Sequence, residues 1–293
     1  LVSWISIRNN NGKHRSKGKK MEIIEILKAI LFGIVEGITE WLPVSSTGHM
    51  ILLDELVKLD VTDEFMSMFL VVIQLGAILA VVVLYFPQLW PFSTKERFFI
   101  KKDTFSMWFK ILVACVPAAV VGILFEDELD RLFYNYWTVA FALIVFGVLF
   151  IIIEHQNKDV VPKVNSIAQI TYPMAFCIGA FQLIAAVFPG TSRSGATILG
   201  AIMIGISRTV AAEFTFFLAV PVMLGASLLK ILKFGLVFST SEVVLLLVGM
   251  VVAFVVSIVV IKLLLGYIRK HSFTVFGWYR IILGIVVLAY FWS

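Results

Sequence analysis

The chain has 293 residues, of which 60% are hydrophobic and only 15% are charged. Soluble domains carry about a quarter of charged residues, so this chain has too few polar side chains to cover a water-soluble core. Its net charge of +5 comes from residues 1–20, which hold six basic and no acidic residues, whereas the rest has 18 basic and 19 acidic residues. This balance excludes nucleic acid as a partner and favours an all-α polytopic membrane protein.

Residues 1–20 are expected to be a basic N-terminal extension, either disordered or non-native. Residues 21–293 are expected to form a single membrane domain.

The first apolar segment, residues 23–58, is interrupted by the sequence PVSSTGH at residues 43–49. Pro43 stops the preceding helix, and the half after the break runs into the charged residues Asp54 and Glu55. These features predict a re-entrant helix–loop–helix hairpin. Non-helical backbone survives at membrane depth only where protein or a watery cavity covers it.

Three uninterrupted apolar runs follow, and each is long enough to span a bilayer, which needs about 20 residues of helix. They cover residues 65–87, 107–125 and 136–154. The loops at 95–102 and 158–163 are basic and predict the cytoplasmic side. The segments 54–64 and 126–130 are acidic and are expected as loops on the opposite side.

The second broken segment, residues 172–207, contains the sequence PGTSRSG at residues 189–195. Its last part, residues 196–206, would make a helix only about 16 Å long, which predicts a second re-entrant hairpin. Three more spans follow at 209–230, 241–266 and 274–292. Two hairpins and six spans place both termini outside, which conflicts with the basic residues 1–20 unless that segment is foreign.

An internal repeat organises the chain, with one unit at about 21–156 and a second at about 168–293. Four pairs share an offset of 146, namely Gly33/Gly179, Glu36/Gln182, Pro43/Pro189 and Ser46/Ser192. Each unit has one hairpin and three spans, and three spans reverse the direction of the chain. The second copy is therefore expected upside down, as an inverted-topology repeat whose broken helices meet near the midplane.

Helices that start inside a membrane present free N–H groups and a positive dipole end, which favour phosphate. The residues around the two breaks suit such a phosphate site. They supply hydroxyl groups or allow close backbone approach, and they are Ser45, Ser46, Thr47, Gly48, Thr191, Ser192, Ser194 and Gly195.

Arg193 needs a partner at membrane depth, and its guanidinium suits phosphate oxygens or an ion pair with Glu36 or Glu40. Glu36 and Glu40 share one helix face. A divalent metal, a shared proton or Arg193 would relieve their repulsion, unless they face outside water, and hard oxygen ligands favour Mg²⁺ or Ca²⁺. Gln182 and Ala186 replace these acids in the second copy, so the acidic site belongs to one half only.

His49 lies three residues after Ser46, on the same face of a helix. A histidine near a hydroxyl and two acids can act as a general base, a general acid or a nucleophile. Cation, phosphate and nucleophile together are the components of phosphoryl transfer.

The sequences GIVEGITEWLPVSSTGHMIL, PGTSRSGATI and SRTVAAEFTFFLAVP resemble the bacitracin-resistance family of undecaprenyl-diphosphate phosphatases, from about Met21 to the end of the chain. The resemblance implies hydrolysis of undecaprenyl diphosphate to the monophosphate, which recycles the lipid carrier of cell-wall synthesis. It also implies a bacterial inner membrane, a divalent cation and a pocket on the outer side. Its motif residues fall on Glu36, Glu40, Ser46, His49 and Arg193.

We therefore expect Glu36 and Glu40 to hold the metal, and Arg193 to bind phosphate. Ser46 is expected to attack phosphorus while His49 or Glu40 takes its proton. Attack by His49 itself or by water stays open. Expected partners are the polyprenyl diphosphate and membrane lipid, and a homodimer is a further expectation.

The alternative function is a secondary transporter or flippase of a phosphorylated lipid, because inverted repeats with broken helices are typical of transporters. The asymmetric cluster of acid, serine and histidine favours an enzyme, since transport needs no nucleophile.

Overall fold

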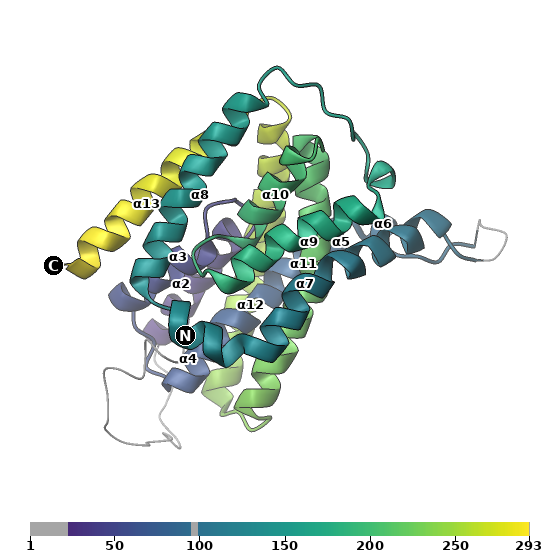
Figure 1. Cartoon of the computed structure of the whole chain (residues 1–293). Coiled ribbons are helices and arrows are strands. Elements are labelled where there is room, and N and C mark those ends of the chain that lie inside the picture. The colour runs from purple at the N-terminus through teal and green to yellow at the C-terminus, as the bar shows by residue number, and fades with distance from the viewer. Residues whose placement is uncertain (1–22, 95–98, 293) are drawn as a thin grey trace.

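The computed structural model describes residues 23–94 and 99–292, so the expected extension at residues 1–20 lies outside the described residues. These residues are almost entirely helical (Figure 1). The helices are α2 (Ile23–Thr39), α3 (Ser46–Leu56), α4 (Asp63–Val72), α5 (Gln74–Leu84), α6 (Phe86–Leu89), α7 (Lys102–Phe133), α8 (Tyr136–Gln156), η1 (Ile167–Gln169), α9 (Tyr172–Val187), α10 (Arg193–Met203), α11 (Arg208–Phe234), α12 (Thr240–Ile268) and α13 (Thr274–Trp292).

Six helical stretches among the described residues are long and apolar enough to cross a membrane, and they confirm the six predicted spans. They are Asp63–Leu84, which joins α4 and α5, Lys102–Phe125, Tyr136–Gln156, Arg208–Phe234, Thr240–Ile268 and Thr274–Trp292. The expected loop at 126–130 is wrong, because α7 continues through it to Phe133. Acidic residues are compatible with a helix that continues into water, so the charge of this segment did not mark the end of the helix.

Both apolar segments predicted to be broken are helix–loop–helix pairs. The first is α2 and α3, and the second is α9 and α10. The helices α3 and α10 have 11 residues each, which is about 16 Å of helix against a bilayer core of about 30 Å. Neither could cross alone. The direction in which each pair enters a bilayer stays a prediction.

The first helix of each pair packs against the opposite half of the chain, α2 along α12 and α9 along α7. Gly33 permits the first crossing, because a Cβ there would lie 2.6 Å from the carbonyl oxygen of Gly249. Gly179 permits the second, because its Cβ would lie 2.3 Å from the carbonyl oxygen of Ala114. These are the glycines that the repeat pairs at an offset of 146, so the two halves exchange the same contact.

The third spans of the two halves, α8 and α13, lie side by side at one edge of the molecule (Figure 1). Gly147 and Gly277 meet at their crossing, where a Cβ on either one would lie 2.7 Å from the carbonyl oxygen of the other. Small residues let helix backbones approach closely in this way, which is the usual basis of helix association in membranes.

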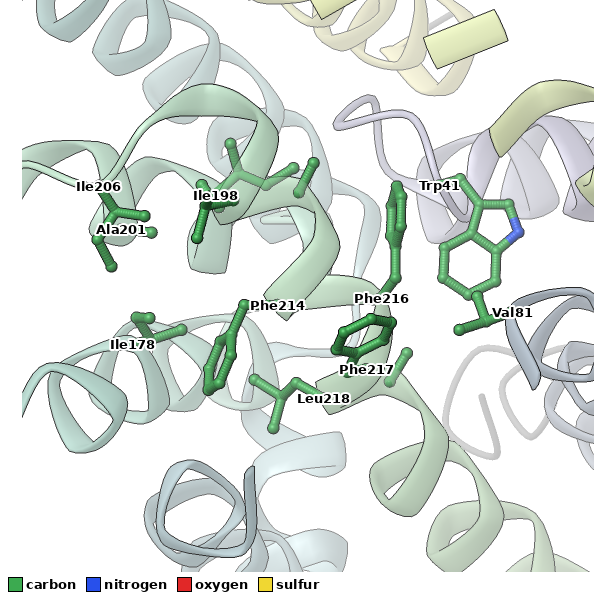
Figure 2. Close-up of a cluster of buried hydrophobic side chains, with 14 of the residues drawn as sticks. Trp41, Val81, Ile178, Ile198, Ala201, Ile206, Phe214, Phe216, Phe217 and Leu218 are labelled. Atoms are coloured by element: carbon green, nitrogen blue, oxygen red, sulfur yellow. The ribbon is translucent and has the colours of Figure 1, made fainter. Parts of the chain in front are cut away.

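The loop of the first broken pair is anchored in a hydrophobic core to which both halves of the chain contribute (Figure 2). Trp41 follows α2, is fully buried, and packs edge-on against Phe216 of α11 with ring centroids 5.2 Å apart. Phe214, Phe217 and Ile198 belong to the same core. Burial of such aromatic surface stabilises the contact between the halves, and it holds the first loop against α11.

Candidate active site

The two short helices begin in the same unusual way. Ser45 caps α3 with φ 74° and accepts a hydrogen bond from the N–H of Gly48 at 3.3 Å. Ser192 caps α10 with φ 70° and accepts from the N–H of Gly195 at 3.1 Å. A non-glycine residue with positive φ is strained, and such strain is typical of functional sites.

This geometry corrects the repeat alignment by one residue. The caps pair Ser45 with Ser192, whereas the sequence alignment paired Ser46 with Ser192. The reason is one additional residue between the proline and the capping serine of the second loop, where Gly190 adopts φ 93°. Ser46 therefore corresponds to Arg193, and each is the first residue of its helix.

Glu40 joins these two first residues across the halves of the chain. One carboxylate oxygen accepts from the Oγ of Ser46 at 2.8 Å, and the other accepts from Nη2 of Arg193 at 2.9 Å. Arg193 also donates to the carbonyl oxygen of Thr215 at 3.4 Å. Three of the residues predicted to act together are thus in direct contact. The ion pair is well buried, with 13% of the Arg193 side chain and 8% of the Glu40 side chain exposed.

Glu36 is fully buried one helical turn before Glu40. No described N–H or O–H group donates to either of its carboxylate oxygens, and its carboxyl group lies close enough to that of Glu40 to share a proton with it. An isolated carboxylate in such a place is strongly unfavourable unless it is paired, coordinates a metal or takes up a proton. Oxygen donors of this kind fit a hard divalent cation. The described residues contain no group of three His, Cys, Asp or Glu side chains that could hold a metal, so other oxygens would complete the coordination.

His49 faces a different neighbour from the one expected. Its Nδ1 lies 2.7 Å from the carbonyl oxygen of Ser45, and its Nε2 lies 2.6 Å from the hydroxyl of Tyr279. The two rings stack with centroids 5.6 Å apart and planes at 8°. Both nitrogens of His49 are therefore engaged, and the hydroxyl of Ser46 donates to Glu40 instead. Of the two predicted acceptors of the serine proton, the geometry favours Glu40.

The other predicted hydroxyl residues lie in the second loop or in the first turns of the two short helices. Ser194 donates to the carbonyl oxygen of Glu40 at 3.1 Å, and it lies 3.2 Å from the Oγ of Ser192. These two serines hold the loops together. Thr191 is fully buried, and its hydroxyl has no partner among the described residues. Thr47 is half-buried in the first turn of α3.

The two glycines predicted at the phosphate site, Gly48 and Gly195, have close neighbours in the direction in which a Cβ would project. A Cβ at Gly195 would lie 2.8 Å from Nη1 of Arg280, and one at Gly48 would lie 3.1 Å from the side chain of Leu143. Their N–H groups already donate to the caps. A direct phosphate contact by either glycine stays a prediction.

Arg280 is a residue of this region that the sequence reasoning missed. It lies on α13, is fully buried, and donates to the carbonyl oxygens of Pro43 at 3.2 Å, Gly190 at 3.0 Å and Thr191 at 2.6 Å. It therefore ties the loops of both broken pairs together. The signal was present, since an arginine inside a predicted span costs at least about 2.5–3.5 kcal/mol by insertion scales. Its partners are backbone carbonyls, which no side-chain motif reveals.

The class of protein follows from three features of the described residues. These are six candidate spans, two broken helix pairs and a buried cluster of acid, serine and arginine. This is a polytopic membrane protein with a polar site built between its two halves. Residues 29–286 match the family model of bacitracin resistance protein BacA, and the chain belongs to this family.

Curated relatives cover nearly the same length. The chain is 64% identical to an undecaprenyl-diphosphatase of Desulfitobacterium hafniense, over 92% of this chain and 98% of the relative. It is 65% identical to undecaprenyl-diphosphatase 1 of Clostridium acetobutylicum, over 92% of this chain and 99% of the relative. An undecaprenyl-diphosphatase of Enterococcus faecalis is 59% identical over the same shares.

Proposed function

We propose that this protein is a membrane phosphatase that hydrolyses undecaprenyl diphosphate to undecaprenyl phosphate and inorganic phosphate. Its family and the names of relatives 59–65% identical over most of the chain support this function. The reaction recycles the lipid carrier of cell-wall synthesis and confers resistance to bacitracin. The observation that carries the mechanism is the contact of Glu40 with both Ser46 and Arg193.

Ser46 is the nucleophile in the proposed mechanism. Its Oγ attacks the terminal phosphorus, Glu40 takes the hydroxyl proton, and the bond from phosphorus to the bridging oxygen breaks. Undecaprenyl phosphate leaves with the electrons of that bond. Water then attacks the phosphoserine and releases inorganic phosphate, with a proton returned to Ser46. The N-terminus of α3 favours the negative charge that develops beside it.

Two other nucleophiles belong to the same proposal as its alternatives. His49 could attack directly, but its Nε2 is held at 2.6 Å from Tyr279. Direct attack by water would leave no covalent adduct. The hydrogen bond from Ser46 to Glu40 favours serine, because it already places a proton acceptor on the attacking oxygen.

Arg193 contributes from the opposite half of the chain. Its planar guanidinium suits two phosphate oxygens at once, and its bond to Glu40 keeps it beside Ser46 before substrate arrives. In the proposed complex, phosphate oxygens take over part of its hydrogen bonding, which frees Glu40 to receive the serine proton.

The candidate cation ligands are Glu36 and Glu40. A Mg²⁺ or Ca²⁺ ion bound there would neutralise charge on the diphosphate. The buried oxygens of Glu36, to which no described N–H or O–H group donates, support this assignment. Removal of divalent ions with EDTA is expected to abolish phosphate release, and added Mg²⁺ or Ca²⁺ to restore it. Full activity in EDTA would contradict the assignment.

The proposed location is the bacterial inner membrane, with the site open to the outer side. The basic sequences at 95–102 and 158–163 support this orientation through the positive-inside rule. The prenyl tail of the substrate would lie between spans in contact with lipid. A homodimer stays a prediction.

Phosphate release from a polyprenyl diphosphate by the detergent-purified protein tests the function. Release that requires a divalent cation is the expected result. No release under any condition would refute the enzyme, and translocation in liposomes without release would favour a carrier. Trapping a phosphorylated protein and locating the group by mass spectrometry distinguishes Ser46 from His49.

A further inference from the structure

A buried glutamine on α9 has no role in the site as described so far. Gln182 is only 2% exposed, and neither its Oε1 nor its Nε2 has a hydrogen-bond partner among the described residues. Burial of a primary amide without partners is unfavourable, so folded proteins nearly always satisfy it. A bound ligand or a water molecule would satisfy the two polar atoms of Gln182.

Gln182 is the equivalent, in the internal repeat, of Glu36 in the proposed cation site. It lies three residues after Gly179, the glycine of the tight crossing with α7. Glu36 lies three residues after Gly33, the glycine of the matching crossing with α12. Both crossings fix the helices closely, so Glu36 and Gln182 occupy equivalent positions in the two halves. Both are buried, and no described N–H or O–H group donates to the side-chain oxygens of either.

The chemistry of the two positions differs in one respect. A carboxylate only accepts hydrogen bonds and attracts cations, whereas the amide Nε2 has two N–H donors and no charge. An amide can therefore approach a phosphate oxygen where a carboxylate would repel it. The short helix that follows each residue shows the same preference for an anion in the second half. Its first residue is the neutral Ser46 after Glu36 and the cationic Arg193 after Gln182.

We propose that Gln182, which precedes Arg193 in the second broken helix pair, is a substrate-binding residue whose Nε2 donates a hydrogen bond to a non-bridging oxygen of the diphosphate. This inference rests on the proposed function. It divides the site between the halves. The first half supplies the proton acceptor, the cation ligands and the nucleophile, and the second half supplies the side-chain donors that hold the anion.

The test compares Gln182→Leu, Gln182→Glu and the wild-type protein in steady-state hydrolysis of a polyprenyl diphosphate, with thermal unfolding measured in parallel. Gln182→Leu removes both polar atoms at similar volume. It is expected to raise KM about tenfold or more, as for the loss of a hydrogen bond to a charged group, without lowering the unfolding midpoint. Gln182→Glu is expected to lose more of kcat/KM and to need a higher Mg²⁺ concentration.

Phe181→Leu is the matched control, because Phe181 is the adjacent residue and packs against Gly200 of α10. It is expected to lower stability while KM stays within twofold of wild type. An equal rise of KM in Phe181→Leu and Gln182→Leu would assign the effect to helix packing and overturn the proposal. A value of kcat/KM within twofold of wild type in Gln182→Leu would also overturn it.

If Gln182→Leu does not fold, Gln182→Met takes its place with the same expected results. An inactive wild-type protein would refute the proposed function itself, whereas an active wild type with an unaffected Gln182 variant would refute only this assignment.

Discussion

Glu40 is the residue on which the proposed chemistry depends, because it contacts Ser46 and Arg193 with different oxygens. Glu40→Gln keeps the shape of the side chain but cannot accept the serine proton. We expect a loss of about 10²–10⁴ in kcat, the usual contribution of a general base. Ser46→Ala is expected to lose about 10³-fold or more.

His49→Ala should lose less activity than either of these variants, since His49 is bonded to Ser45 and Tyr279 and not to the nucleophile. Phosphate release under saturating substrate ranks the three variants. A His49→Ala variant as inactive as Ser46→Ala, together with a phosphohistidine adduct, would reverse the assignment.

Arg193→Lys tests whether the guanidinium acts through its shape or only through its charge. A lysine keeps the charge but cannot bind two oxygens in one plane. We expect kcat/KM to fall about tenfold or more for Arg193→Lys and further for Arg193→Ala, with both proteins folded. An active Arg193→Ala would exclude this residue from substrate binding.

At the scale of elements, the strained starts of α3 and α10 give a prediction on stability. Ser192→Ala removes the cap bond to Gly195 but keeps a non-glycine residue at φ 70°. We expect a cost of about 1 kcal/mol. Ser192→Gly loses the same bond but relieves the strain, so its thermal midpoint should lie above that of Ser192→Ala. The opposite order would show that strain contributes little here.

Arg280 links the two loops, so its loss is expected to affect both broken helix pairs together. Arg280→Met leaves three buried carbonyl oxygens without their donor. We expect a loss of about 2–4 kcal/mol and of most activity. Arg280→Lys should lie between this variant and wild type in thermal unfolding. Wild-type stability in Arg280→Met would mean that the loops hold their shape without the link.

At the scale of the whole molecule, the exchanged crossings predict equal effects in the two halves. Gly33→Ala and Gly179→Ala each place a Cβ within 2.6 Å of a backbone oxygen. We expect each to destabilise the protein by about 1–3 kcal/mol. Gly225→Ala on α11 is the control, because nothing lies within 4 Å of its Cβ. Its higher helix propensity should leave stability unchanged or raise it by up to about 1 kcal/mol.

Much of this architecture could be predicted from the sequence, because hydrophobic length and proline breaks act locally. The six spans and both broken segments follow from such signals. The sequence reasoning placed Glu40, Ser46 and Arg193 in one site, since buried charges require partners, but it left open whether Arg193 pairs with Glu36 or Glu40 and whether Ser46 faces His49 or Glu40. The one-residue shift between the two caps was not predicted, because the positive φ that identifies Ser45 and Ser192 as equivalent caps depends on packing and not on residue type. The bond of His49 to Tyr279 joins residues 230 positions apart, and no local pattern encodes it.

The ion pair of Glu40 with Arg193 also has a consequence for biogenesis. Its partners are 153 residues apart, so ribosomes complete the acidic half before the arginine exists. The first half, once inserted, holds its carboxylates and serine without the arginine whose charge balances them. The proposed catalysis therefore requires at least that α10 has been made, and a chain that ends before Arg193 is expected to be inert rather than partly active.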